Sequence, residues 1–198
     1  MKSSGSYDMM LEEFAACARR VGSEDLAKCS SGNLSVRHGD IVLLSATGSW
    51  LPDLTEEEVS ICRLDDGKVL NGVKPTMESG FHLGIMRARP EVNSVLHFQS
   101  PYATVVSCMK DKPENFNVTL EIPMYIGREI PVLPYIQPGT EELASAVVKA
   151  MRDHDVAILS NHGQVAAGED FSSALRKAVF FEMACRIIVL SRGNFTVI

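Results

Sequence analysis

The chain has 198 residues, of which 45% are hydrophobic and 22% are charged, a balance shared by soluble globular proteins. Its formal net charge of −6 argues against nucleic acid or an anionic membrane as a partner, and its apolar runs are shorter than the roughly 18 residues that span a bilayer. Five scattered cysteines without a CxxC motif, and an N-terminus without the apolar core of a signal peptide, predict reduced thiols in the cytoplasm. We expect a single domain over residues 1–198.

The first half of the chain is predicted to combine helices and hairpins. Apolar residues at helical spacing predict a helix over 7–21. Two strands joined by a tight turn at Gly39 are predicted within 33–45. Thr55 and Glu58 form a capping-box pattern, and the chain then continues into a strand, an Asp-Gly turn and a short return strand.

The second half is predicted to add further helices and strands in alternation. A helix that starts at Thr76 ends before Pro90, a strand follows at 93–98, and helices follow at 100–110 and 140–153. The segment VAILSNHGQVAAG predicts two short strands around a turn, before a final helix over 171–191. Hairpins and helices alternate without a regular βαβ rhythm, which favours a mixed or antiparallel sheet with helices packed on it.

Several side chains that can bind a metal fall within these elements. His97 and Gln99 lie two apart on a predicted strand and therefore share a face, and His162 lies in a turn between apolar strands, where function tends to concentrate. His82 follows Glu78 by four on a helix, so these two share a face, and for His82 we favour packing or a supporting contact. Two interpretations remain open: a zinc site with an open position, or core histidines with polar neighbours.

Three small-residue turns form a second group of candidates. They are SSGNLS at 30–35, SATGS at 45–49 and KPTMES at 74–79. Such turns present backbone N–H groups and hydroxyls that can bind an anion, phosphate especially. The alternative is that glycine and serine simply make turns here.

Taken in order, the motifs resemble the class II aldolase/adducin family, and most of all its L-fuculose-1-phosphate aldolase branch. The resemblance spans nearly the whole chain and rests on five short patterns. They are SGNLS at 31–35, SATG at 45–48, PTMExxxH at 75–82, VLHxQ at 95–99 and NHGxxxxG at 161–168. Each pattern alone is modest, and their shared order carries the resemblance.

The resemblance implies a fold, a cofactor and an assembly. We expect an α/β fold with three α/β/α layers around a mostly antiparallel sheet, a Zn²⁺ or other divalent cation, a sugar-phosphate substrate, and a homotetramer with sites at subunit interfaces. The implied roles are catalytic acid/base for Glu78, metal positions for His97, Gln99 and His162, and substrate-phosphate contacts for Gly32, Asn33, Thr47, Gly48 and Thr76.

Three features depart from the family pattern. Gln99 stands where the family has a histidine, and Met77 stands where it has a hydroxyl residue. The sequence ends at Ile198, without the tail that supplies a tyrosine proton donor in the fuculose enzyme. The function implied is zinc-dependent cleavage of a ketose phosphate to dihydroxyacetone phosphate and a short aldehyde. A sugar-phosphate epimerase or dehydratase, and a non-catalytic adducin-like binding module, stay open beside it.

Overall fold

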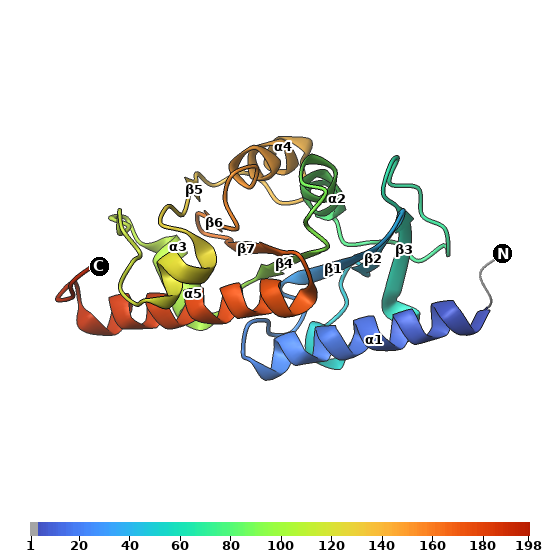
Figure 1. The fold of residues 1–198 in the computed structure, drawn as a ribbon, viewed down its shortest axis with the longest axis horizontal. Coiled ribbons are helices and arrows are strands. Elements are labelled where there is room, and N and C mark those ends of the chain that lie inside the picture. Colours follow the sequence, from blue (N-terminus) through green and yellow to red (C-terminus); the bar gives the residue numbers. More distant parts are fainter. Residues whose placement is uncertain (1–3) are drawn as a thin grey trace.

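The computed structural model describes residues 4–198, so residues 1–3 of the expected domain lie outside the described part. One seven-stranded sheet runs through it. The strands are β1 (Asn33–His38), β2 (Ile41–Ser45), β3 (Val59–Arg63), β4 (Ser94–Phe98), β5 (Val132–Leu133), β6 (Val156–Leu159) and β7 (Gly163–Gly168). Their order across the sheet is β3-β2-β1-β4-β7-β6-β5 (Figure 1). Only β5 and β6 pair in parallel, so the predicted mostly antiparallel sheet is confirmed.

Helices cover both faces of this sheet and complete three layers. They are α1 (Ser4–Ser23), α2 (Ser79–Ala88), α3 (Pro101–Cys108), α4 (Glu141–Ala150) and α5 (Phe171–Ser191), with short helical turns at Leu51–Asp53, Glu56–Glu58 and Ile122–Ile126. The long helices α1 and α5 lie on one side of the sheet, and α2 and α4 lie on the other (Figure 1). This arrangement is the α/β/α architecture that the resemblance implied.

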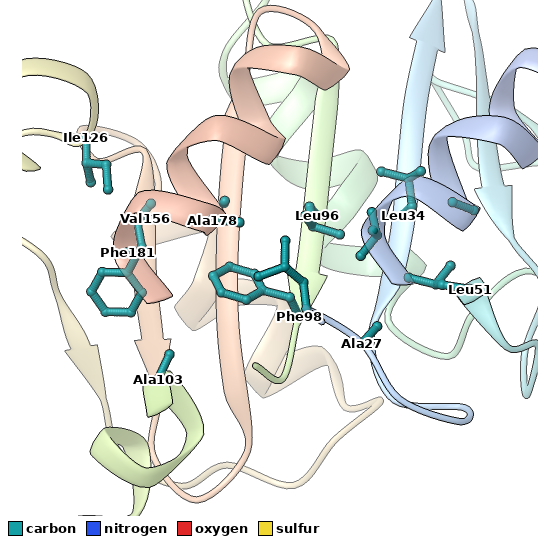
Figure 2. Close-up of a cluster of buried hydrophobic side chains, with 14 of the residues drawn as sticks. Ala27, Leu34, Leu51, Leu96, Phe98, Ala103, Ile126, Val156, Ala178 and Phe181 are labelled. Carbon is teal, nitrogen blue, oxygen red and sulfur yellow. The ribbon is translucent and has the colours of Figure 1, made fainter. Parts of the chain in front are cut away.

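Each face of the sheet has its own hydrophobic cluster. Leu96 and Phe98 of β4 point toward α5, where they join a cluster that includes Ala178 and Phe181 (Figure 2). Val95 points the opposite way and joins the cluster beneath α2 and α4. This alternation follows from the two-residue period of a strand. It also places His97, between Leu96 and Phe98, on the same face as α2.

The predicted capping residues begin their elements. The Thr140 hydroxyl accepts a hydrogen bond from the Leu143 amide at 3.2 Å and so starts α4. Thr55 and Glu58 form the reciprocal capping box, which here opens a single short turn before β3.

In the described part of the chain, no helix is long and apolar enough to cross a membrane. All five cysteines are free thiols.

The structure differs from the sequence predictions at a few element boundaries. The helix predicted from Thr76 begins at Ser79, because the Glu78 backbone, at φ −98° and ψ 9°, lies just outside the helix. The predicted return strand after the Asp-Gly turn is only an isolated bridge between Cys62 and Val69. Strand β5 was not predicted, because two residues are too few to show any periodicity.

Candidate active site

A cavity of about 290 Å³ opens where β1, β4 and β7 come together near the start of α2. Every residue that the sequence singled out for the site lines it. These residues are Gly32, Asn33, Thr47, Gly48, Thr76, Glu78, His97, Gln99 and His162. Segments that lie far apart in the sequence therefore form one cavity.

Strand pairing determines where the two histidines lie. His97 of β4 is opposite Asn33 of β1 on one side and Val165 of β7 on the other. His162 precedes β7 in a tight turn whose Asn161 has a left-handed backbone with φ +57°. The two imidazole rings are 4.8 Å apart between centroids.

Gly163, the first residue of β7, allows this close approach. A Cβ atom at this position would lie 2.7 Å from the Phe98 carbonyl oxygen and 2.9 Å from Cε1 of His97. It would also lie 2.8 Å from Cγ of Gln99. Only glycine lets the turn that carries His162 pack this tightly against the end of β4.

Glu78 completes a cluster of three donors with these histidines. Its Oε2 atom is 3.5 Å from Nε2 of His97, and its Oε1 atom is 3.4 Å from Nε2 of His162. One ligand atom from each of the three side chains lies within 4.8 Å of the others. Two imidazole nitrogens and a carboxylate oxygen are a donor set that catalytic zinc sites use.

The hydrogen bonds around the cluster also suit a cation. Nδ1 of His97 donates to the backbone oxygen of Gln164 at 2.9 Å, which leaves the Nε2 lone pair directed at Glu78. Oε1 of Glu78 is buried and has no hydrogen-bond partner among the described residues. An orphaned carboxylate oxygen 3.4 Å from the imidazole nitrogen of His162 fits a divalent metal, so the residues present match the group that the resemblance implied.

Gln99 also lies on the cavity wall, in contact range of the Gly163 position. The structure thus brings Glu78 to the metal-type cluster, where the sequence had assigned it acid/base chemistry. Its two oxygens can divide these tasks. The place of Gln99 as a metal ligand stays a prediction.

The surroundings lower the pKa values of His162 and His82. Burial lowers the pKa of His162 to about 4, and the neighbouring His97 acts in the same direction. Burial also lowers the pKa of His82 to about 3. For Glu78, burial alone would raise the pKa, but His97 and the hydrogen bond from Asn33 outweigh it and lower the pKa. A neutral imidazole beside a carboxylate is the protonation state that metal binding needs.

Acid is therefore expected to destabilise the metal-free protein as the pH falls from about 6.5 to about 4. In this window the unfolded chain binds a proton at His162 while the folded chain does not, so the free energy of unfolding decreases. His82 extends the effect to about pH 3. Thermal unfolding in chelator across this range tests it. His82→Gln should flatten the dependence, and an unfolding temperature that does not change with pH would contradict the assignment.

The expected phosphate contacts Thr47, Gly48 and Thr76 line the same cavity. Gly48 has φ +77°, and Thr47 beside it is exposed to solvent. The Thr76 hydroxyl accepts from the Glu78 amide at 3.3 Å, which leaves its own O–H free to donate. Among the described residues that line the cavity, none is a lysine or an arginine. An anion would be held here by hydroxyls and backbone N–H groups.

Six lining residues were given no individual role by the sequence analysis: Ser30, Ser31, Ala46, Ser49, Met77 and Pro138. Pro138 comes from the turn before α4, and the Gln-Pro-Gly-Thr pattern at 137–140 was the available signal. Met77 was noted as a departure, and its side chain is 63% exposed at the cavity edge. Its sulfur lies 3.3 Å from where a Cβ of Gly139 would be, so Met77 joins the two turns.

The chain is thus a three-layer α/β/α protein with a Glu–His–His cluster that could hold a metal ion at the end of its central strands. The chain is a member of the class II aldolase and adducin family, since the model of the "Class II Aldolase and Adducin N-terminal domain" matches residues 12–189.

Relatives within this family carry more than one activity in their names. The chain is 32% identical over 167 residues to a 3-oxo-tetronate 4-phosphate decarboxylase of Haemophilus influenzae, covering 83% of this chain and 79% of the relative. It is 33% identical over 180 residues to an L-fuculose phosphate aldolase of Methanocaldococcus jannaschii, covering 91% and 96%.

Solved structures show the same fold. The YgbL protein of Escherichia coli, whose description names aldolase, epimerase and decarboxylase, superposes with a TM-score of 0.87 at 28% identity, covering 94% of this chain and 91% of YgbL. An L-fuculose 1-phosphate aldolase superposes with a TM-score of 0.84 at 23% identity, covering 100% and 91%.

Proposed function

We propose that this protein is a divalent-metal-dependent aldolase that cleaves the carbon–carbon bond next to the carbonyl and hydroxyl carbons of a ketose phosphate. The substrate we favour resembles L-fuculose-1-phosphate, with dihydroxyacetone phosphate and a short aldehyde as products. The observation that carries the proposal is the convergence of Glu78, His97 and His162 in one cavity. The aldolase relatives support it.

His97, His162 and Glu78 are the residues that would hold the cation, which we propose to be Zn²⁺. Gln99 lines the same cavity, and we propose its amide oxygen as a further ligand. When bound, the cation supplies Lewis-acid polarisation of the substrate carbonyl.

The remaining steps belong to the chain's own side chains. In the cleavage direction Glu78 delivers a proton to the substrate carbon beside the carbonyl, which balances the proton lost by the leaving hydroxyl. In the reverse direction its free oxygen takes that proton back, because a carboxylate with a lowered pKa is ionised. Gly32, Thr47, Gly48 and Thr76 would orient the phosphate, which fixes the reacting carbons against Glu78. The side chain of Asn33 contacts Glu78 instead, so its expected phosphate contact would use its remaining N–H groups.

Decarboxylation is the second candidate function. It is favoured by a relative at 32% identity that is named a 3-oxo-tetronate 4-phosphate decarboxylase. Both reactions break a bond beside a carbonyl and leave negative charge on the same carbon and oxygen atoms. They differ in the leaving group, which is an aldehyde in one reaction and carbon dioxide in the other. A decarboxylase would not need a group that takes a proton from the leaving hydroxyl.

A sugar-phosphate epimerase or dehydratase and a non-catalytic adducin-like module are weaker candidates. The Glu–His–His cluster, with its oriented His97, counts against a purely structural role. An epimerase would re-form the bond that an aldolase breaks, so it would use the same residues.

One comparison of substrates tests the proposal. The protein is loaded with Zn²⁺ and incubated with a ketose 1-phosphate panel and with a phosphorylated 3-oxo acid, and products are followed by coupled detection of dihydroxyacetone phosphate and by carbon dioxide release. Aldehyde together with dihydroxyacetone phosphate supports the aldolase. Carbon dioxide alone supports the decarboxylase, and turnover of neither substrate class overturns both.

We also propose that the protein is a homo-oligomer, with a tetramer as the expected state, and that it works in the cytoplasm. The titratable groups that line the cavity in the described chain are Glu78, His97 and His162 only. The group that takes the proton from the leaving hydroxyl must therefore come from another subunit or be water. Light scattering at micromolar concentration is expected to show an oligomer, and a monomer would contradict the shared site.

A further inference from the structure

A chain of buried side chains lies directly behind Glu78. Nδ2 of Asn33 donates to Oε2 of Glu78 at 2.9 Å, and Oδ1 of Asn33 is hydrogen-bonded to Nε2 of His82. Nδ1 of His82 lies 2.7 Å from the hydroxyl oxygen of Ser35. His82 and Ser35 are completely buried, and Asn33 is 8% exposed. This chain of hydrogen bonds links β1 to α2 beneath the cavity.

The direction of every hydrogen bond in this chain follows from its last member. A carboxylate can only accept, so Asn33 must present its N–H₂ group to Glu78 and its oxygen to His82. The oxygen of Asn33 can only accept as well, so Nε2 of His82 carries the proton. His82 is neutral, hence its Nδ1 atom accepts from the Ser35 hydroxyl. The order of donation is Ser35 to His82 to Asn33 to Glu78.

This direction makes the two oxygens of Glu78 unequal. Oε2 is engaged by Asn33, whereas Oε1 has no hydrogen-bond partner among the described residues and is 3.4 Å from Nε2 of His162. A carboxylate that lost Asn33 could rotate and exchange the two oxygens. The hydrogen-bond chain holds it in one orientation.

We propose that His82 is a positioning residue, which acts through Asn33 to fix the Glu78 carboxylate with Oε1 free for the metal and for proton transfer. This inference deepens the proposed function and rests on Glu78 having that role. It assigns to His82 a specific contribution beyond filling the space under α2. Groups that orient a metal ligand from behind change metal affinity or activity by roughly 10–100-fold when they are removed.

The competing explanation is packing alone. Phe81 stacks on the His82 ring with centroids 4.7 Å apart and the planes inclined by 19°, so the imidazole also fills space. Two substitutions of similar size separate the roles. His82→Leu removes both hydrogen bonds, and His82→Gln keeps an N–H donor that can reach Asn33. If His82 only fills space, the leucine variant should bind zinc and turn over substrate at least as well as the glutamine variant. If His82 positions Glu78, the glutamine variant should do both better.

The experiment measures Zn²⁺ affinity of the full chain by competition with a chelator, and kcat and KM at saturating metal. We expect His82→Leu to weaken zinc binding and to lower kcat by about 10–100-fold, with KM little changed, and His82→Gln to recover most of both losses. Met86→Ala is the matched control, since Met86 is buried one turn further along α2 and belongs to the hydrophobic cluster there. It should lower the unfolding temperature and leave zinc affinity unchanged.

A second measurement keeps the inference testable if the leucine variant fails to fold or if no substrate is found. Nitrogen-15 NMR of the histidine rings in the metal-free wild-type protein reports which nitrogen of His82 carries the proton. We expect Nε2–H, and Ser35→Ala should weaken this preference and reduce zinc affinity in the same direction as His82→Leu.

The outcomes separate the inference from the proposed function. An Nδ1–H tautomer in the wild type, or equal zinc affinities in the leucine and glutamine variants, overturns the role of His82. A wild-type protein that binds no Zn²⁺ overturns the proposed function, while the tautomer still decides the direction of the hydrogen-bond chain. Equal losses in Met86→Ala and His82→Leu would show that general destabilisation accounts for the effect.

Discussion

Glu78→Gln is expected to lower kcat by about 10²–10⁴-fold on the ketose phosphate that the protein cleaves, measured at saturating metal. Glutamine keeps the size of the side chain and can still accept the hydrogen bond from Asn33, but it cannot take up a proton at the cavity. It also replaces an anionic metal donor by a neutral one, so zinc affinity should fall. Measuring kcat at saturating metal removes the effect of weaker zinc binding, so the remaining loss in kcat reports proton transfer alone.

Glu142→Gln is the control for this substitution, because Glu142 is an exposed carboxylate on α4 outside the cavity lining. It should leave both the rate and zinc affinity unchanged. If Glu78→Gln retained wild-type kcat with metal bound, then Glu78 would serve only as a ligand, and another group would move the proton.

Gln99→His is expected to tighten zinc binding by about 10–100-fold. A neutral imidazole nitrogen is a better donor to zinc than an amide oxygen, and the new ring would lie on the same strand end as His97. If metal occupancy limits the wild-type protein, activity at low metal should rise by a similar factor. Chelator competition and a metal titration of the rate provide the two measurements.

Gln99→Leu serves as the matched control, since it removes the amide and adds no donor. Zinc affinity should then stay level or fall. Unchanged affinity in Gln99→His would mean that position 99 faces the substrate and does not face the metal. Tighter zinc with no cleavage of any ketose phosphate would instead favour the decarboxylase or another activity of the family.

Local chemistry in the sequence predicted most of the elements. The helix that starts at Thr140 and the hairpin at Gly39 depend on residues within a few positions of each other, and such signals are visible without tertiary structure. The strand β5 and the π-helical turn Ile122–Ile126 depend instead on neighbours far along the chain. Periodicity contains no information about them.

In the candidate site, too, features set by local sequence were predictable, whereas contacts between distant segments were not. That His97 and Gln99 share a face follows from strand geometry, and the structure places both at the cavity. The hydrogen bond between Asn33 and Glu78 could not be predicted, because it depends on how β1 packs against the start of α2. The four-residue spacing of Glu78 and His82 was visible, but Glu78 precedes the helix rather than sharing its face, and the connection through Asn33 could not be predicted.

The cluster has a consequence for folding kinetics. Its three donors come from the start of α2, the end of β4 and the β6–β7 turn, so they meet only after β4 has paired with both β1 and β7. Such long-range pairing forms slowly, and an unfolded chain offers a cation no assembled site. Bound zinc should therefore prolong the lifetime of the native state by slowing unfolding, with little effect on the refolding rate. The cation would bind only after the fold is complete and would then stabilise the native state kinetically.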